Sequence, residues 1–414
     1  MSLDAASLSA LQAALAQERD ARIVFLQSLV QTPSDNPPGD CTAIAETTAD
    51  RLERHGFAVE RHAVPDQVVR AHGMLSCTNL IVRQRFGSGD GPVVALNAHG
   101  DVVPPGDGWQ HAPYGGEIDA GALYGRGAAV SKADIASYTF ALKALAPVAD
   151  RLNGVVELHI TFDEEIGGLI GPKWILDQGL SKPSLCISAG LSHSVVTAHN
   201  GCLHLEVTVR GRSAHAAAPH TGHDALEAAN DVLTALYEQR AILAEQVSAT
   251  AGIGSPQLTI GLISGGINTN VVPDKVSFRL DRRLIPEEDA SAVEAALMQL
   301  IQGAVAHRPG IALDIKRLLR ASPLRQLDGA ELLIDPIQRH GARVFGHPLE
   351  IEGVPLYTDA RLYAEAGVPT VSYGAGPRSF LEANGHRAEE HVRLSDFDGA
   401  TEVVACTLAE LLGA

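Results

Sequence analysis

The sequence predicts an α/β protein built on a mixed, largely parallel sheet, with a smaller α+β domain inserted into it. Short apolar, β-branched runs such as PVVALNAH, GVVELHITF and SLCISAG alternate with helix-period segments in the part of the chain before residue 201. Strands that alternate with helices favour a parallel sheet covered on both faces. The functional loops of such a sheet lie at the carboxyl ends of its strands.

A second pattern begins near Gly201. The segments LHLEVTVRGR, DKVSFRLDRRL and IALDIKRL alternate like half-exposed strands, and two long amphipathic segments between them are typical of helices. About a hundred residues of this kind are enough for a domain. We therefore predict an inserted domain at residues 202–318, and a main domain made of residues 1–201 and 319–414.

Composition and charge narrow the class of protein. The chain has 414 residues, of which 45% are hydrophobic and 20% charged, as in ordinary globular proteins. Its formal net charge of −17 argues against nucleic acid and anionic membranes as partners. The N-terminal segment has a helical pattern that acidic residues interrupt, which is unlike a signal peptide. Five scattered cysteines form no CxxC pair, so neither a disulfide framework nor a zinc ribbon is indicated, and we expect a cytoplasmic protein.

Two strand ends carry residues suited to metal chemistry. The motif HGD places His99 at the end of a predicted strand, with Asp101 two residues later. Such a carboxylate can fix the orientation of a ligating imidazole. In TFDEEIGG, Glu164 and Glu165 follow the next strand, and one glutamate can ligate a metal while its neighbour acts as general base. For each motif alone, a surface loop or an acidic helix start is the better explanation; the pair together favours a metal site.

Two further histidines stand in loops whose composition is suited to a site. His386 lies in the glycine-flanked segment EANGHRAEEHV before the last predicted helix, and His215 follows a strand in GRSAHAAAPHTG. The chain has 17 histidines, and most histidines in proteins are ordinary polar residues. Only their place within a wider pattern can single out these two.

That wider pattern resembles the M20 metallopeptidase family of deacetylases, desuccinylases and carboxypeptidases. The segments that carry the resemblance occur in the family's order along nearly the whole chain: LNAHGDVVPPGDGWQHAPYGGEIDAGALYGRGA, TFDEEIGG, GRSAHAAAPHTG, GGINTNVVPDKVSFRLDRRLIPEE, YTDARLYAEAGVPTVSYGAGP and GHRAEEHV. The resemblance implies a zinc-peptidase-like catalytic domain interrupted by a ferredoxin-like lid domain, through which subunits of such enzymes often form homodimers or larger homo-oligomers.

The resemblance also implies a role for each matching residue. His99 looks like a ligand of the first metal, with Asp101 as its carboxylate partner. Glu164 looks like the general base, while Glu165 and His386 look like ligands of the second metal. In the lid, His215 is expected to polarise the scissile group in a partner subunit. Residues implied to bind substrate are Asn270 and Arg283, at its carboxylate or its transition state, and Gly374 and Gly376, in a glycine-rich loop.

The chain departs from the family pattern at two metal ligands. The family motif reads approximately GRGAxDxK, and its aspartate bridges the two metals; this chain has Val130 there. Gly190 stands where a second carboxylate would ligate the first metal. Residues near the lost ligands that could substitute for them are Ser131, Asp134, His193 and His199, although Asp134 fits a helix start better.

The surviving set of His99, Glu165 and His386 is a recognised arrangement for one catalytic divalent ion. We expect one weakly held Mn, Zn or Co ion per chain, since fewer carboxylates compensate its charge. Three functions remain open. The first is a mononuclear aminohydrolase of a small carboxylate-bearing substrate, like the M20 relative that hydrolyses 5-nitroanthranilate. The second is a conventional N-acyl-amino-acid deacylase or carboxypeptidase, and the third is an inactive small-molecule-binding homologue.

Overall fold

The computed structural model describes residues 3–379 and 382–413, which form two compact units. The first unit comprises residues 1–197, 326–352 and 358–414, and the second comprises residues 198–325 and 353–357. The boundaries therefore lie a few residues from those predicted. The short segment 353–357 joins the second unit because it contacts that unit's own chain, for example where Gly353 N donates to Ala251 O at 2.7 Å.

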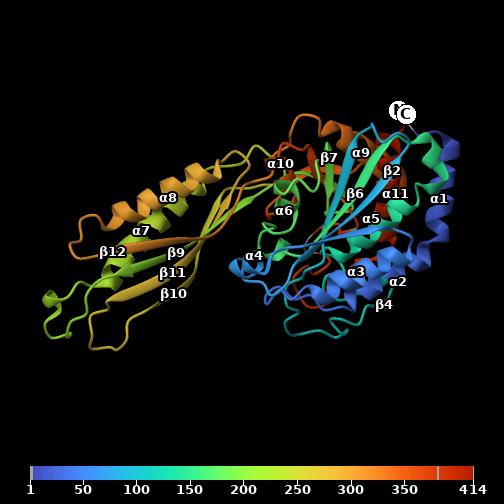
Figure 1. Ribbon diagram of the computed structural model, residues 1–414. Helices are drawn as coiled ribbons and strands as arrows, with labels where there is room; N and C mark the ends of the chain where they lie inside the picture. Colours follow the sequence, from blue (N-terminus) through green and yellow to red (C-terminus); the bar gives the residue numbers. More distant parts are fainter. Residues whose placement is uncertain (1–2, 380–381, 414) are drawn as a thin grey trace. The chain divides into compact units, whose positions relative to one another are not determined.

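An eight-stranded mixed sheet forms the centre of the first unit, in the order β1-β2-β6-β3-β7-β14-β8-β13 (Figure 1). Its strands are β1 (Val59–Ala63), β2 (Thr78–Phe86), β3 (Val93–His99), β6 (Gly154–Thr161), β7 (Leu185–Ser188), β8 (Ser194–His199), β13 (Glu350–Val354) and β14 (Thr370–Ser372). The central strands β6, β3, β7 and β14 pair in parallel, whereas β1, β2 and β8 join antiparallel. The prediction of a mixed α/β sheet with a parallel centre is confirmed.

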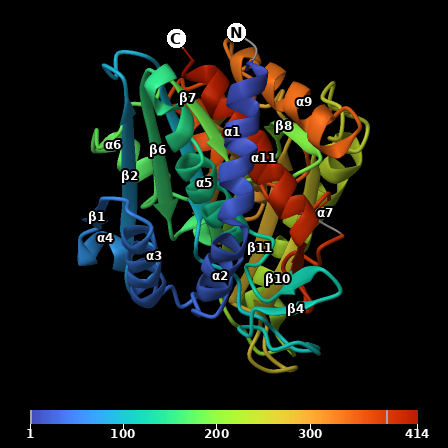
Figure 2. The ribbon, with the colours of Figure 1, turned by 90° about the vertical axis from the view of Figure 1, so that its right-hand side faces the viewer.

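Helices cover both faces of this sheet. One face carries a helical layer that packs around the central α5 and the C-terminal α11, visible in front of the sheet in Figure 2. That layer comprises α1 (Ala5–Gln17), α2 (Arg19–Val30), α3 (Thr42–Arg54), α5 (Lys132–Lys143), α9 (Glu331–Phe345) and α11 (Leu394–Leu411). The short helices α6 (Pro172–Asp177) and α10 (Ala360–Glu365) pack together, and α10 contacts β7 and β14. Strands buried on two faces need the continuous apolar runs seen in the sequence.

The N-terminal segment forms two helices, where the sequence pattern predicted one. The chain leaves the helical conformation at Glu18, whose backbone N–H donates to Ala14 O and Ala16 O and so ends α1. Helix α2 then starts at Arg19 and turns a fully buried side, including Phe25 and Leu26, to the core. The break lets both helices bury an apolar face, which one straight helix would not.

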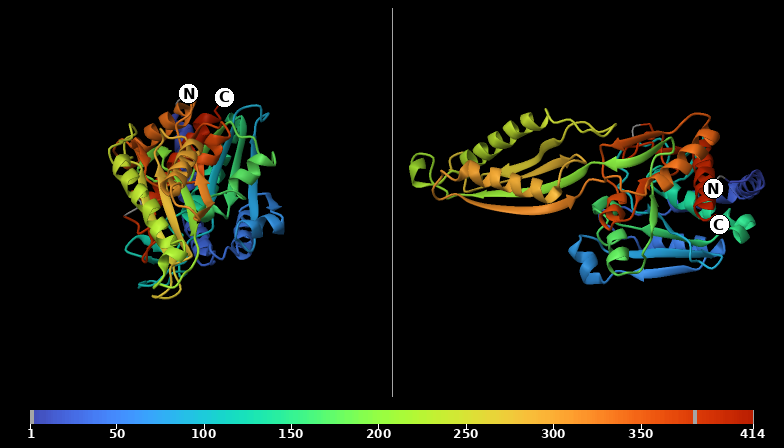
Figure 3. Two further views of the ribbon diagram at one scale, coloured as in Figure 1. Left: turned by 90° about the vertical axis from the view of Figure 1, so that its left-hand side faces the viewer. Right: turned by 90° about the horizontal axis from the view of Figure 1, so that it is seen from above.

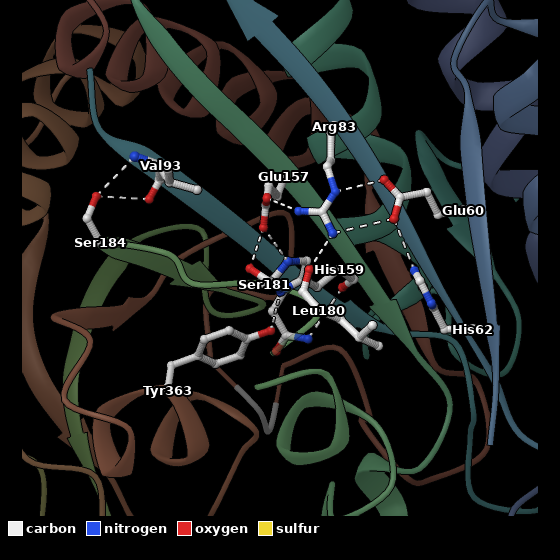
Figure 4. A network of polar contacts seen from close by, with 11 residues as sticks. Glu60, His62, Arg83, Val93, Glu157, His159, Leu180, Ser181, Ser184 and Tyr363 are labelled. Atoms are coloured by element: carbon white, nitrogen blue, oxygen red, sulfur yellow. Dashed lines mark hydrogen bonds and ion pairs between the residues drawn. The ribbon is translucent and has the colours of Figure 1, made fainter. Parts of the chain in front are cut away.

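A buried polar network ties the outer strands of the sheet to α10 (Figure 4). His159 on β6 lies 2.8 Å from the Tyr363 hydroxyl through Nδ1 and 3.0 Å from Glu157 Oε2 through Nε2. Arg83 of β2 pairs with Glu157, which also accepts from the Ser181 hydroxyl. Although burial raises the pKa of Glu157, these hydrogen bonds hold it below its usual value. Every charge in this network has a partner, so we assign it to stability.

The second unit is a four-stranded sheet, ordered β10-β11-β9-β12, with helices α7 and α8 on one face (Figures 1 and 3). Its elements are β9 (Gly201–Arg210), α7 (Ala225–Leu243), β10 (Gln257–Gly265), β11 (Lys275–Leu284), α8 (Ala290–Val305) and β12 (Ala312–Ala321). Leu203, Leu205 and Val207 alternate along β9 toward the helices and are fully buried. The opposite face of the sheet carries polar side chains, as expected of an antiparallel sheet covered on one side.

Smaller elements complete the two units. They are α4 (Asp66–Ala71), β4 (Glu117–Asp119), β5 (Ala122–Tyr124), β15 (His391–Arg393), and the 3-10 turns η1 (Ala146–Arg151), η2 (Glu164–Ile166) and η3 (Pro219–Thr221). Strands β15, β5 and β4 form a separate three-stranded sheet. Within residues 3–379 and 382–413, no helix combines the length and apolarity needed to span a bilayer.

Candidate metal centre

The parallel pairing of β3 and β6 brings the two predicted metal motifs together. His99 ends β3 directly opposite Thr161, the last residue of β6. Parallel strands end at the same edge of a sheet, so the chain that continues from each strand enters one region. Asp101 follows from β3, and the turn η2 that begins at Glu164 follows from β6.

Asp101 is the residue around which this region is arranged. Its carboxylate accepts the backbone N–H of Glu164 at 3.3 Å, the N–H of Glu165 at 3.2 Å and the amide of Asn36 at 3.0 Å. The Nδ1 atom of His99 lies 3.0 Å from the Asp101 carbonyl and 3.3 Å from its carboxylate. With Nδ1 donating to Asp101, the Nε2 lone pair of His99 is available toward Glu164, the tautomer that metal-ligating histidines use.

The side chains of His99, Glu164 and Glu165 converge. One potential ligand atom from each lies within 4.8 Å of the others, and His99 Nε2 is 3.9 Å from Glu164 Oε2. Glu165 Oε1 is buried and, within the described part of the chain, has no hydrogen-bond partner, although His386 Nε2 lies 3.4 Å away. A buried carboxylate oxygen without a hydrogen bond is costly unless a cation compensates it. This donor set of imidazole nitrogens and carboxylate oxygens therefore fits one divalent ion.

The pKa values of the clustered side chains are shifted because several charged groups are buried close together. Burial, together with the nearby charges of Glu165 and Asp101, raises the pKa of Glu164 to about 7 against the opposing effect of His99. Burial alone would lower the pKa of His99, but Glu164 and Asp101 raise it well above its usual value. The Glu165 carboxylate, whose Oε1 lies 3.4 Å from His386 Nε2, raises the pKa of His386. A Glu164 side chain that titrates near neutrality is suited to proton transfer.

The region around Val130 and Gly190, where the resemblance places two further ligands, has a different structure. Val130 is half-buried, and its N–H donates to Glu390 Oε1 at 3.2 Å. Gly190 has no room for any side chain, because a Cβ atom there would lie 2.7 Å from the carbonyl carbon of Ser372 and from Tyr373 N. The backbone of the loop after β14 thus occupies the space that a carboxylate at position 190 would need.

Asp134 fills part of this region, although not as a ligand of the His99 cluster. It lies in the first turn of α5, as the sequence suggested, but is fully buried, and Oδ1 accepts the N–H of Ala375 at 2.7 Å. Burial raises its pKa to about 7, while hydrogen bonds from the backbone of Ala375 and Gly190 oppose the change. Its carboxylate is thus used to hold the loop after β14.

The other possible substitutes have different partners. The Ser131 hydroxyl bonds to the backbone of His99, and His193 lies 3.1 Å from His347 and 3.3 Å from Asp396. His199 belongs to the second unit, where Nδ1 lies 2.9 Å from the Asn200 carbonyl. Within the described ranges, none of these candidates falls in a group of three or more ligand-type side chains.

Two glycines predicted to bind substrate have packing roles in the structure. At Gly374, a Cβ atom would lie 1.8 Å from Asp134 Oδ1. At Gly376, it would lie 2.4 Å from the carbonyl of Gly190, which also accepts the Gly376 N–H at 3.0 Å. Both positions need glycine because neighbouring atoms approach so closely. Their part in substrate binding stays a prediction.

The remaining predicted residues belong to the second unit. His215 and Asn270 lie on neighbouring loops, joined where Ala216 N donates to Asn270 O at 3.0 Å. Both side chains are exposed, and the ring of His215 accepts the N–H of Ala217 at 3.0 Å. Arg283 lies on β11 and donates to Asp281 at 3.0 Å. Their predicted contact with substrate stays a prediction as well.

Three buried residues near the site were not predicted. Asn36 holds Asp101, Glu390 holds the backbone of Val130 and pairs with Arg126, and the buried Asp359 lies near Glu164. The acidic pair in GHRAEEHV and the aspartate in YTDARLY were visible signals for two of them. Nothing in the sequence around Asn36 distinguishes it from a loop asparagine.

Comparisons with known proteins identify the family. A profile of peptidase family M20/M25/M40 matches residues 95–410. This chain belongs to peptidase family M20. The succinyl-diaminopimelate desuccinylase of Acidiphilium cryptum (strain JF-5) is 30% identical over 394 residues, covering 92% of this M20 chain and 94% of the relative.

Solved structures confirm the fold. The M20 family metallo-carboxypeptidase Sso-CP2 from Sulfolobus solfataricus superposes with a TM-score of 0.73 at 19% identity, covering 94% of this chain and 98% of that one. The YXEP protein of Bacillus subtilis, a dinuclear metal binding peptidase, gives a TM-score of 0.70 at 17% identity, with coverages of 96% and 99%. This M20 chain is thus a hydrolase of a metal-dependent family.

Proposed function

We propose that this M20 hydrolase uses a single divalent ion to cleave a non-peptide C–N bond in a small carboxylate-bearing substrate. The observation that supports the proposal is the asymmetry of the site. His99, Glu164 and Glu165 converge, with His386 beside Glu165, whereas Val130 and Gly190 stand at the two positions where the resemblance places further carboxylate ligands. We assign the ion to His99, Glu165 and His386, and expect Mn, Zn or Co to serve.

The chain's own residues would carry the proton transfers. A bound ion would supply Lewis acidity and orient a water molecule. Glu164 would accept the proton of the attacking water and pass it to the departing nitrogen, which a pKa near neutrality favours. Asp101 would hold His99 and the backbone of Glu164 in position throughout. As the family resemblance implies, Arg283 and Asn270 would bind the substrate carboxylate or transition state, and His215 of the partner subunit would hold the developing negative charge.

The substrate class follows from having one ion to stabilise the developing charge. When an amide is attacked, negative charge collects on a single oxygen. When 5-nitroanthranilate is attacked at the carbon bearing its amine, the charge spreads into the nitro group, so less stabilisation by a second ion is needed. We therefore propose an aminohydrolase of this type that releases ammonia.

A second function is supported by a different observation. The relative with 30% identity is a succinyl-diaminopimelate desuccinylase, and the chain covers nearly all of it. A conventional deacylase of N-acyl amino acids would need other groups to supply the metal ligands that Val130 and Gly190 cannot supply. Asp134 lies in that region, but its carboxylate accepts hydrogen bonds from backbone amides instead.

Metal stoichiometry separates these functions. Protein dialysed against chelator is reloaded with Mn, Co or Zn and analysed for bound metal, then assayed with 5-nitroanthranilate for ammonia and with N-succinyl-diaminopimelate for succinate. We expect close to one ion in the His99 cluster per chain, and ammonia release only with metal present. Two tightly held ions in that cluster, together with succinate release, would establish the conventional deacylase. No turnover of either substrate, with or without added metal, would indicate a binding homologue.

A further inference from the structure

The face of the second unit's sheet that lacks helices carries a cysteine, a histidine and an aspartate side by side. Cys202 and His204 lie two residues apart on β9, so both side chains point away from the helices that cover Leu203 and Leu205. On the adjacent strand β11, Asp281 pairs directly opposite His204. Two neighbouring strands therefore present three metal-ligand side chains at one place.

The three side chains have the separations of a metal's ligand shell. Cys202 Sγ lies 3.0 Å from His204 Nε2, His204 Nε2 lies 3.1 Å from Asp281 Oδ2, and Cys202 Sγ lies 3.9 Å from Asp281 Oδ1. Ligands around tetrahedral zinc stand about 3.3–3.8 Å from one another, given bond lengths of roughly 2.0–2.3 Å. Movements of a few tenths of an ångström would place all three around one ion.

We propose that Cys202, His204 and Asp281 form a second metal site, one that binds a borderline divalent ion such as Zn(II) or Co(II). Thiolate, imidazole and carboxylate are the donors that such ions prefer, whereas Mg(II) and Ca(II) prefer oxygen alone. Binding would displace the thiol proton of Cys202 into solvent. The side chains of His204 and Asp281 are 36% and 31% exposed, which leaves a route for the ion and a position for a water ligand.

The proposed metal site lies beside Arg283, a residue expected to bind substrate. Its Nε donates to both oxygens of Asp281, at 3.0 and 3.1 Å, and Arg283 pairs opposite Cys202 in the strand register. A ligating carboxylate that is also hydrogen-bonded is held in orientation by that second contact. An ion on Asp281 would in turn weaken its hold on Arg283, so occupancy of the site would alter how freely Arg283 moves.

This site is chemically distinct from the His99 cluster, and its existence does not depend on the proposed function. The His99 cluster contains only nitrogen and oxygen donors, whereas the second site contains sulfur. A thiolate bound to Co(II) gives an intense charge-transfer absorption in the near ultraviolet, which ligands without sulfur do not. The two sites can therefore be followed separately in one protein.

The test is a Co(II) titration of the metal-free full-length chain, followed by absorption. We expect the charge-transfer band to saturate at one thiolate-bound Co(II) per chain. Cys202→Ser should abolish the band, while His204→Gln and Asp281→Asn should weaken binding about 10-fold or more. Glu206→Gln is the matched control, because Glu206 lies on the same face of β9 and pairs with Arg279 as Asp281 pairs with Arg283.

The Co(II) titration tests the site independently of catalytic activity, and the variants distinguish loss of a ligand from misfolding. Absence of the band at saturating Co(II), or its persistence in Cys202→Ser, would overturn the proposal even if the enzyme were active. Should Cys202→Ser fail to fold, the variants His204→Gln and Asp281→Asn at partly exposed positions still decide it. Binding unchanged in both would also overturn the site.

Discussion

The two halves of the candidate metal centre differ in what fills them: ligand-type side chains in one, and packed backbone in the other. In one half, His99, Glu164, Glu165 and His386 crowd together, and a carboxylate oxygen of Glu165 is buried without a hydrogen bond in the described structure. In the other half, the backbone near Gly190 packs against the loop after β14 with no space for a side chain. The first half offers donor atoms to a cation, and the second is filled by protein backbone.

At Gly190, where the resemblance places a carboxylate ligand, the backbone is closely packed. Replacing a carboxylate by glycine usually leaves a cavity, yet here Gly376 N bonds to Gly190 O at 3.0 Å and Asp134 binds the same loop. Close packing of this kind makes the change hard to reverse at one residue. The retained half carries the converging donor atoms, so its residues are the ones to test for catalysis.

The largest effect should come from the base in the retained half. Glu164→Gln keeps the size of the side chain but removes its ability to accept a proton, so we expect kcat to fall by about 10²–10⁴-fold. Metal affinity should change little, since we assign the ion to other residues. Steady-state kinetics and metal analysis of the same preparation check both statements.

His386→Ala is the matched variant for that experiment. It removes a proposed ligand whose ring is largely exposed, so the fold should persist while metal binding and turnover fall together. If the Glu164→Gln variant retained full activity, another group would have to transfer the proton.

The next effect concerns the packed half. Gly190→Ala adds one methyl group that would lie 2.7 Å from two backbone atoms, so we expect it to destabilise the protein by about 1–3 kcal/mol. Gly303→Ala in α8 adds the same group where nothing lies within 4 Å, and should be neutral or stabilising. Denaturant unfolding of both variants measures the difference, and equal stability would mean that the loop moves aside freely.

The residues of the retained half could be predicted from the sequence, whereas the packing of the other half could not. His99 and Glu164 could be predicted because each follows an apolar strand, and parallel strands end together. The hydrogen bond from Asn36 to Asp101 and that from Val130 N to Glu390 join residues 65 and 260 positions apart, and no local pattern marks such contacts. The α/β class followed from periodicity, whereas the closure at Gly190 depends on where a distant loop passes.

A smaller effect should appear in the pH dependence of stability. The pKa of Asp134 is raised to about 7 in the folded protein, so the folded state holds its proton more tightly than the unfolded state. The stability this contributes is present below the unfolded value of 3.8 and is lost as pH rises toward about 7. Asp134→Asn cannot lose a proton, so the metal-free variant should gain roughly 1–3 kcal/mol relative to wild type between about pH 5 and pH 8. Thermal unfolding at both pH values checks the sign, and a gain toward low pH would contradict it.

The smallest change in stability, and the sharpest test of the comparison, should come from Val130→Asp. The resemblance places Val130 at the bridging position, and the residue is half-buried with only its backbone N–H held by Glu390, so we expect a cost of under about 1 kcal/mol. The added carboxylate should tighten binding of the proposed single ion about tenfold without recruiting a second one, because the backbone at Gly190 still excludes a ligand side chain there. Val130→Asn, of the same shape without the charge, should give a smaller gain. Isothermal titration with Mn or Zn measures both, and two ions bound in the His99 cluster of Val130→Asp would show that one carboxylate alone separates this chain from a binuclear enzyme.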